Sequence, residues 1–500
     1  MIKNKIKNQI GKYSQARKSA INLLAYVYLG ALIIAIIAYG PSPLFYLLFA
    51  AIAALFILPN HYFLGFCLLI TLTMLFERFF TLTGLVIDRE IYKFYLLDIV
   101  MVLSFAALAV RHFILQKKRR FIWGWPETLL ACFMLLVAVY LFRSLFDINA
   151  KFEVAFSSFK NYFFYPLLYF FTVLVVQSPK RLKQVSQLIM LNGVILIAFL
   201  LIGFVRGAGL WTEFTPLSTA GVRYLAGTHA FYLLIAMMIG VPLLAFNRLR
   251  NQWLGLLVFA LWSMGIIVSL MRHLWLAAII GIAALFILMP YQNKKFISRQ
   301  AIKAGLLVVS LVLAAVLAAN LAYFNPATET AAGNVRNISE RLLSLRDLSE
   351  DTSASWRLDL WKDAQQVWQA NPIWGIGFGH TILIDTGDYQ NFEEIRNIHN
   401  SPLAIIVQMG LVGLIVFALF ILTVFISAWR PAYTNFDLIP YYLGVAVAIL
   451  IFLFASCFQP YLETNLMGIW LWILLGLLRS ATIINKTVKQ PEQTQIETAQ

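Results

Sequence analysis

Two adjoining apolar stretches near the middle of the chain decide the fold. Residues 253–289 read WLGLLVFALWSMGIIVSLMRHLWLAAIIGIAALFILM, and only Met271, Arg272 and His273 separate the two stretches. Each is continuously apolar over nearly the length that an α-helix needs to cross a bilayer, whereas the strands of a membrane barrel alternate apolar and polar residues. The pattern therefore predicts two membrane-spanning helices joined by a tight turn.

Similar stretches recur along the whole chain. Its 500 residues are 61% hydrophobic and 12% charged, whereas a soluble domain carries about 25% charged residues. Apolar spans are predicted at 20–38, 43–58, 62–80, 94–110, 126–145, 162–177, 185–205, 225–246, 253–270, 274–289, 304–323, 401–428, 438–457 and 465–482. The sequence thus predicts an all-α, polytopic integral membrane protein with about 14 (12–14) transmembrane helices.

The placement of basic residues sets the expected orientation. A net charge of +16 would suggest a nucleic-acid partner in a soluble protein. Here 24 of the 39 Lys and Arg residues fall on the side of the N-terminus when the loops are assigned alternately, against 9 in short loops of the other side. The positive-inside rule then predicts cytoplasmic termini, and it explains the charge without nucleic acid.

These spans divide the chain into five expected parts. They are a basic cytoplasmic segment (1–19), transmembrane helices 1–11 (20–323), a large extracytoplasmic helical loop domain (324–400), transmembrane helices 12–14 (401–482) and a disordered cytoplasmic tail (483–500). The loop carries 11 of the 23 acidic residues. Within it, one predicted helical face carries Trp356, Leu360, Ala364, Val367 and Trp368. We expect that tryptophan-rich face at the membrane interface.

Several kinds of chemistry have no support in the sequence. There is no phosphate-binding P-loop and no HExxH motif, and the three cysteines lie in apolar runs. We therefore expect no metal, no cofactor and no nucleotide. Glu77, Asp98, Glu127 and Glu463 fall near the ends of spans. The absence of a mid-span carboxylate weakens an ion-coupled transport hypothesis.

Four cationic or titratable groups are expected at the outer face: Arg223, Arg272, Arg357 and His399. Arginine at the edge of hydrocarbon is costly, and its planar fork suits phosphate oxygens. Each group also has a structural alternative. This is snorkelling for Arg223, a structural ion pair or snorkelling for Arg272, an ion pair within the loop for Arg357, and a capping or loop role for His399.

The functional interpretation joins these groups into one site. His399 precedes a predicted helix with Ser401 as N-cap and Pro402 at the first helical position. The positive end of a helix favours anions and keeps a nearby imidazole neutral. His399 could then take a proton from an acceptor hydroxyl while Arg223 and Arg272 stabilise a leaving diphosphate.

A set of motifs resembles the O-antigen ligase/polymerase family. They are Arg223, Ser269–Arg272–Trp275, Arg357, Trp361, Asn371-Pro372, Gly375-Ile376-Gly377, His399-Asn400 and the sequence QMGLVG at 408–413. The resemblance covers roughly residues 220–480. It implies a GT-C-type membrane glycosyltransferase of the bacterial inner membrane that uses an undecaprenyl-diphosphate-linked glycan as donor at the periplasmic face.

The resemblance also assigns roles to residues. It implies that His399 is the activating base, that Arg223 and Arg272 bind the diphosphate, and that Arg357, Asn400, Gly375 and Gly377 contact donor or acceptor from the loop. Ligases of the family usually have 12 spans, so the 14 predicted here are a departure.

The acceptor stays open at this point. A ligase would use the lipid A-core, a repeat-unit polymerase would use another glycan, and an oligosaccharyltransferase would use a protein hydroxyl. A solute or anion transporter and a non-catalytic assembly protein are alternatives from other classes.

Overall fold

The computed structural model forms two compact units, residues 1–120 and 121–500, which are considered separately. In the first unit the structure describes residues 27–28, 30–31, 48–54, 62–75, 85–87, 90–92 and 95–113. In the second it describes residues 121–147, 150, 152–206, 225, 227–269, 271–322, 352–385, 390–432 and 437–497. The basic segment 1–19, Arg223 and the loop stretch 324–351 lie outside the described residues.

The described part of the first unit contains two apolar helices that pack together, α3 (Tyr62–Leu75) and α5 (Leu96–Phe113). A short antiparallel hairpin lies between them in sequence, formed by β1 (Leu85–Ile87) and β2 (Glu90–Tyr92). Both helices coincide closely with predicted spans, 62–80 and 94–110.

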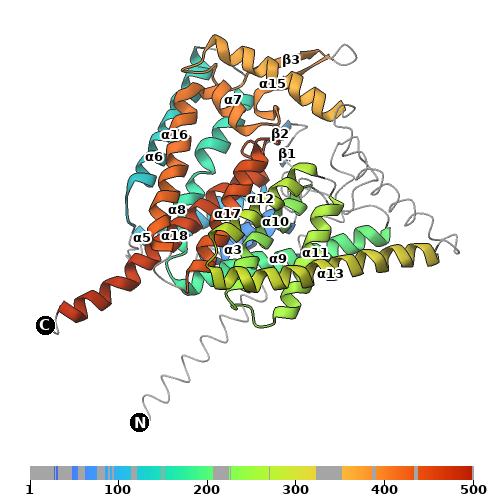
Figure 1. The fold of residues 1–500 in the computed structure, drawn as a ribbon. Coiled ribbons are helices and arrows are strands. Elements are labelled where there is room, and N and C mark those ends of the chain that lie inside the picture. Colours follow the sequence, from blue (N-terminus) through green and yellow to red (C-terminus); the bar gives the residue numbers. More distant parts are fainter. Residues whose placement is uncertain are drawn as a thin grey trace. The chain divides into compact units, whose positions relative to one another are not determined.

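The second unit is built almost wholly of helices (Figure 1). In chain order these elements are α6 (Trp125–Phe146), α7 (Phe152–Phe159), the π-helix η1 (Lys160–Phe164), α8 (Leu167–Val175), α9 (Pro179–Arg206), α10 (Gly227–Ala245), α11 (Gln252–Val268), α12 (Arg272–Leu288), α13 (Tyr291–Ala322), α15 (Thr352–Ala370), β3 (Thr381–Asp385), β4 (Gln390–Glu394), the 3-10 helix η6 (Ile395–Asn397), α16 (Ser401–Ala432), α17 (Ile439–Ser456) and α18 (Asn465–Glu497). β3 and β4 form an antiparallel hairpin.

Among the described residues, five helices are long and apolar enough to cross a membrane. They are Trp125–Phe146, Gly227–Ala245, Ser401–Trp429, Ile439–Ser456 and Asn465–Lys486. α3, α11 and α12 are apolar but shorter. A helical multi-pass membrane protein is therefore confirmed in general form, and the two short hairpins are its departures from an all-α structure. The tight turn predicted between α11 and α12 is present, because α11 ends at Val268 and α12 begins at Arg272.

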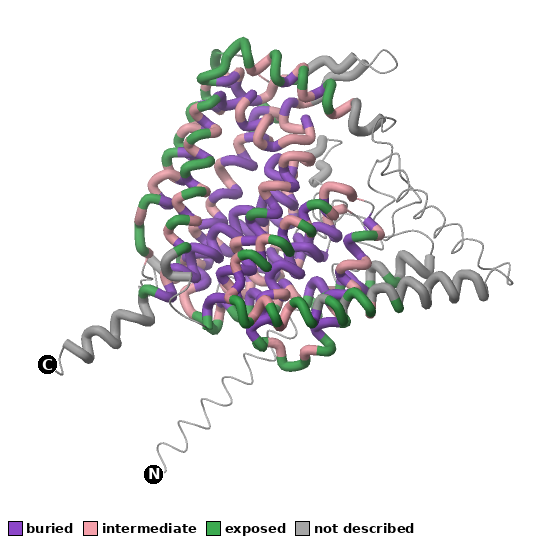
Figure 2. The backbone as a smooth tube through the Cα atoms, viewed as in Figure 1, coloured by how far each residue is buried: buried purple, intermediate pink, exposed green. Residues whose placement is uncertain are grey.

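The core of the second unit lies around α10, α17 and α18, which are buried along most of their length (Figure 2). α10 and α17 approach so closely that a methyl group added at Gly444 would lie 2.8 Å from Cα of Ile239. By contrast, α6 and α16 are apolar helices that leave one face exposed, as expected for helices that meet lipid. The polar segment after residue 483, which we expect to be disordered, continues α18 as far as Glu497.

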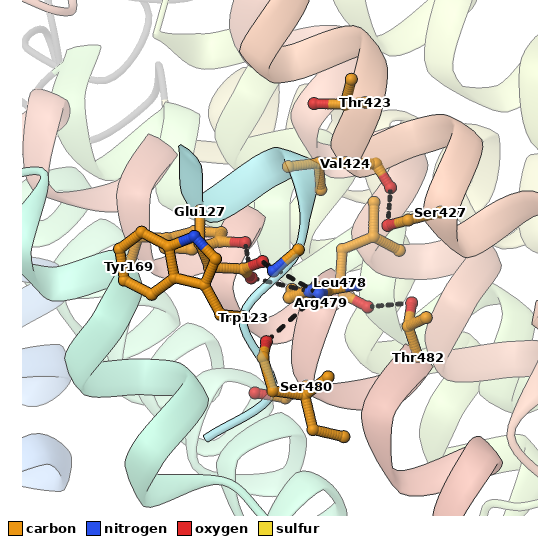
Figure 3. Close-up of polar contacts among 12 residues, drawn as sticks. Trp123, Glu127, Tyr169, Thr423, Val424, Ser427, Leu478, Arg479, Ser480 and Thr482 are labelled. Carbon is orange, nitrogen blue, oxygen red and sulfur yellow. Dashed lines mark hydrogen bonds and ion pairs between the residues drawn. The ribbon is translucent and has the colours of Figure 1, made fainter. Parts of the chain in front are cut away.

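A buried ion pair joins α6 to α18 (Figure 3). Nε of Arg479 lies 2.8 Å from Oε1 of Glu127, and Nη2 of Arg479 lies 2.9 Å from Oε2 of Glu127. The same carboxylate accepts hydrogen bonds from the Tyr169 hydroxyl on α8 and from the backbone N–H of Gly124. Both charges are almost fully buried, and their mutual bonds satisfy them, so the pair connects three helices without an uncompensated charge.

Candidate active site

The candidate base, His399, lies at the entrance to α16. Oδ1 of Asn400 accepts a hydrogen bond from the Leu403 N–H at 3.0 Å, and the Asn400 carbonyl accepts the first helical bond from Ala404. Asn400 is therefore the N-cap, and the prediction that Ser401 caps this helix was wrong by one residue. The hydroxyl of Ser401 is used elsewhere, because it donates to a buried carboxylate that belongs to another loop.

The His399 ring is partly buried and makes two defined contacts. Its Nδ1 lies 2.9 Å from Oε1 of Gln459, and the Trp356 ring meets it edge-on with centroids 5.5 Å apart. Burial, helped by the nearby positive charge of Arg357, lowers the pKa of His399 to about 4 against the opposing effect of the hydrogen bond to Gln459. The imidazole is therefore neutral at neutral pH.

The loop helix α15 brings Arg357 to this ring. The predicted face of the helix is confirmed, because Leu360 and Ala364 are buried in a cluster with residues of η6 and α16, and Trp356, Val367 and Trp368 pack on it. That face covers protein, where we expected the membrane interface. Nε1 of Trp361 also donates to the Ile398 carbonyl at 2.8 Å, which fixes the residue just before His399.

A glycine-rich loop follows α15 and inserts into a break in α16. The break is at Gly410, whose φ of 65° and ψ of −169° are not helical. It frees the Val407 and Gln408 carbonyls, which accept hydrogen bonds from the N–H groups of Ile376 and Gly377. Gly375 has a φ of 63°, and an added methyl group there would lie 2.5 Å from the backbone N of Gly410.

The end of α6 holds the same loop from the other side. The Tyr140 hydroxyl donates to the Trp374 carbonyl, and Nη1 of Arg143 lies 3.3 Å from the carbonyls of both Trp374 and Gly375. Ser144 accepts a hydrogen bond from the Phe378 N–H at 2.7 Å. Gly375 and Gly377 are buried and thus have a structural role, while their contact with a substrate stays a prediction.

The loop between α17 and α18 supplies Gln459 and Glu463, which the sequence does not mark as site residues. Glu463 is 4% exposed, and its carboxylate accepts hydrogen bonds from the hydroxyls of Tyr162 and Ser401. Burial raises the pKa of Glu463 to about 7, against the opposing effect of these hydrogen bonds and of Arg396. The sequence placed Glu463 only near the end of an apolar span. Its partners lie far away in sequence, and the only signal was an acidic residue in a short loop between apolar spans.

Arg272 directly precedes His273, which contacts this loop. It is the first residue of α12, and Nε2 of the next residue, His273, lies 2.9 Å from the Tyr461 hydroxyl. The charge of Arg357 acts on Tyr461 as well, opposing the rise in the pKa of that phenol that burial causes. The loop 457–464 therefore connects the entrance of α12 with His399 and Arg357. Arg223, the other predicted diphosphate ligand, lies outside the described residues.

The arrangement offers acid–base and anion-binding chemistry. It combines an uncharged imidazole with a nearby arginine, as proton removal next to a negatively charged leaving group requires. Among the residues that the structure describes, no three His, Cys, Asp or Glu side chains are grouped so that they could hold a metal ion.

The helices indicate a multi-pass membrane protein, and the candidate site lies at the entrance of one of them. Residues 255–418 match the family model described as O-antigen ligase, and this match supports an assignment to the O-antigen ligase family. The matched region runs from α11 into α16 and includes Arg272, Arg357 and His399. The match supports a membrane glycosyltransferase of the ligase or polymerase type in general terms. No curated protein matches the chain.

Proposed function

We propose that this protein transfers a glycan from undecaprenyl diphosphate to an acceptor hydroxyl, without a metal ion, at the periplasmic face of the bacterial inner membrane. His399 is the base. The observation that carries the proposal is the uncharged His399 ring, held at the entrance of α16 beside the charge of Arg357. The family assignment supports a glycosyl transfer reaction over solute transport.

The reaction forms one carbon–oxygen bond, breaks another, and transfers one proton to the base. Nε2 of His399 takes the proton of the acceptor hydroxyl as its oxygen attacks the anomeric carbon of the donor sugar. The bond between that carbon and the diphosphate oxygen breaks, and its electron pair stays on the diphosphate. The imidazolium then releases the proton to water, which restores the neutral ring. A pKa of about 4 favours this release.

Positive charge is needed where the leaving group gains negative charge. Arg272 and Arg223 bind the two phosphates in this proposal, and Arg357 adds charge close to the base. Arginine is suited to this role because its guanidinium can bind two phosphate oxygens at once. In this proposal Asn400, Gly375 and Gly377 contact the donor or acceptor sugar from the loop.

The test uses the purified protein in lipid with an undecaprenyl-diphosphate glycan and a lipid A-core acceptor. His399→Asn is expected to lower kcat by about 100- to 10,000-fold, the usual contribution of a general base, with donor affinity unchanged. Lys362→Ala is the control, because its side chain is exposed on α15 and pairs only with Asp359 in the described contacts. Transfer by His399→Asn at the wild-type rate would overturn the proposed role of the base.

The same assay separates the sources of the acceptor. Transfer only to a second glycan unit would identify a polymerase, and transfer to neither acceptor, with uptake of solute by proteoliposomes, would favour a transporter. Arg272→Ala is expected to weaken donor binding, and an unchanged donor affinity would remove Arg272 from the diphosphate site.

A further inference from the structure

The orientation of the His399 ring is restrained by a residue that the reaction scheme does not use. For Nε2 to accept a proton, the ring must carry its own proton on Nδ1. The partner of Nδ1 is the side-chain oxygen of Gln459 at 2.9 Å. The amide oxygen of a glutamine side chain can only accept a hydrogen bond, so this contact favours the tautomer with the proton on Nδ1.

The backbone at His399 does not provide this restraint by itself. His399 has a φ of 55°, a left-handed conformation that is uncommon for a residue with a side chain. It is one of two such non-glycine residues among those that the structure describes. Strain of this kind, about 1–3 kcal/mol, persists only where the surroundings enforce it. The Ile398 carbonyl and the Asn400 cap fix the backbone on either side, and the ring still needs a partner to define its tautomer.

Gln459 is well placed to be that partner because its loop is held at two points. Glu463 accepts hydrogen bonds from Ser401, two residues after His399, and from Tyr162 in the π-helix η1. Asn161 of the same π-helix donates to the Glu463 carbonyl. These bonds tie the loop 457–464 to the start of α16, so the base and its partner are fixed to each other.

The second point of attachment is Tyr461, two residues after Gln459. The Tyr461 hydroxyl meets His273 at the start of α12, and the Tyr461 ring packs against Phe231 and Phe452 with centroids 4.9 and 6.1 Å away. These contacts restrain the backbone of the loop, and they thereby limit how far Gln459 can move away from His399. A glutamine so placed can position a ring without adding charge, whereas a carboxylate there would raise the pKa of the histidine.

Resting on the proposed function, we propose that Gln459 is the positioning residue of the base: its side-chain oxygen holds the proton on Nδ1 of His399 and leaves Nε2 as the acceptor. Gln459 itself touches neither donor nor acceptor. It acts through His399, as the partners of histidine ligands do in metal sites, where their loss typically costs 10- to 100-fold in activity.

The first test reads the tautomer directly. The protein is labelled with 15N-histidine in lipid, and the His399 signals are those missing from the His399→Asn spectrum. In the wild type at pH 7 we expect the proton on Nδ1. In Gln459→Met, which keeps the length of the side chain but not its oxygen, we expect a mixture of tautomers. A wild-type proton on Nε2, or an unchanged spectrum in Gln459→Met, would overturn the proposal.

The second test uses kinetics. Gln459→Met is expected to lower kcat about 10- to 100-fold with KM nearly unchanged. Gln459→Glu keeps an acceptor oxygen and adds a negative charge, so it should move the acid limb of the pH profile upward by about 1–3 pH units. Gln366→Met on the exposed face of α15 is the matched control. A Gln459→Glu profile that coincides with the wild-type profile would contradict the positioning role.

These measurements separate the two proposals. The spectrum needs no substrate, so it tests Gln459 even if the protein transfers no glycan. Conversely, an active His399→Asn variant would remove the base from the proposed function whatever tautomer the wild-type ring adopts.

Discussion

The break in α16 predicts a severe effect for one added methyl group, in Gly410→Ala. At Gly410 the backbone angles, φ 65° and ψ −169°, are accessible to glycine and cost other residues about 1–3 kcal/mol. The added Cβ would also lie 2.1 Å from the Ile373 carbonyl oxygen and 2.6 Å from the Trp374 backbone N. Ordinary contacts are about 3.5 Å or more, so the loop has to move away by roughly 1.4 Å, the difference between these contact distances.

That movement breaks the hydrogen bonds between the loop and the helix. These run from Leu411 to Pro372, from Val412 to Ile373, from Ile376 to Val407 and from Gly377 to Gln408, at 2.9–3.3 Å. A hydrogen bond contributes about 0.5–1.5 kcal/mol, so the loss of two or three of them, added to the strain, is on the order of 3–5 kcal/mol. A displacement of about 1 Å near a reacting group can also cost about 100-fold in rate.

Thermal unfolding in detergent and the glycan transfer assay measure the two effects. Gly410→Ala is expected to lower both Tm and kcat, and to make the segment 371–380 more susceptible to proteolysis. Gly305→Ala on α13 is the matched control, because its added methyl group meets nothing within 4 Å and alanine favours a helix by up to about 1 kcal/mol over glycine. If Gly410→Ala unfolds at the wild-type temperature and keeps its rate, the account of the α16 break is wrong.

Two further changes test the electrostatics of the protein. Burial is the main reason for the low pKa of His399, and the positive charge of Arg357 adds to it. In Arg357→Gln only the second effect is gone, so the acid limb of kcat/KM, expected near pH 4 in the wild type, moves to higher pH but stays below 6.5. An acid limb that stays in place would show that Arg357 does not act on the base. Glu127→Gln leaves the buried guanidinium of Arg479 uncompensated and should lower the free energy of unfolding by about 3–5 kcal/mol, measured in detergent. Replacing both Glu127 and Arg479 by leucine should recover most of that loss, and a double variant as unstable as Glu127→Gln would contradict this explanation.

The sequence by itself indicated a helical membrane protein, the positions of several of its apolar helices and a resemblance to the O-antigen ligase family. Long apolar runs leave a chain few alternatives in a bilayer, because backbone polar groups there are satisfied within helices. The sequence also predicted the apolar face of α15, because the spacing of apolar residues along a helix follows from local geometry. His399 could be selected because it directly precedes a predicted helix and lies in a stretch that resembles the family.

Only the tertiary structure decided which groups meet. Gln459 and Glu463 lie about sixty residues after His399 in sequence, and their hydrogen bonds to His399 and Ser401 depend on how α16, α17 and α18 pack. The pairing of Glu127 with Arg479 likewise spans most of the second unit. A local sequence pattern predicts a helix and which of its faces is apolar. Contacts between distant segments depend on the packing of the whole helical unit, which no short stretch of sequence encodes.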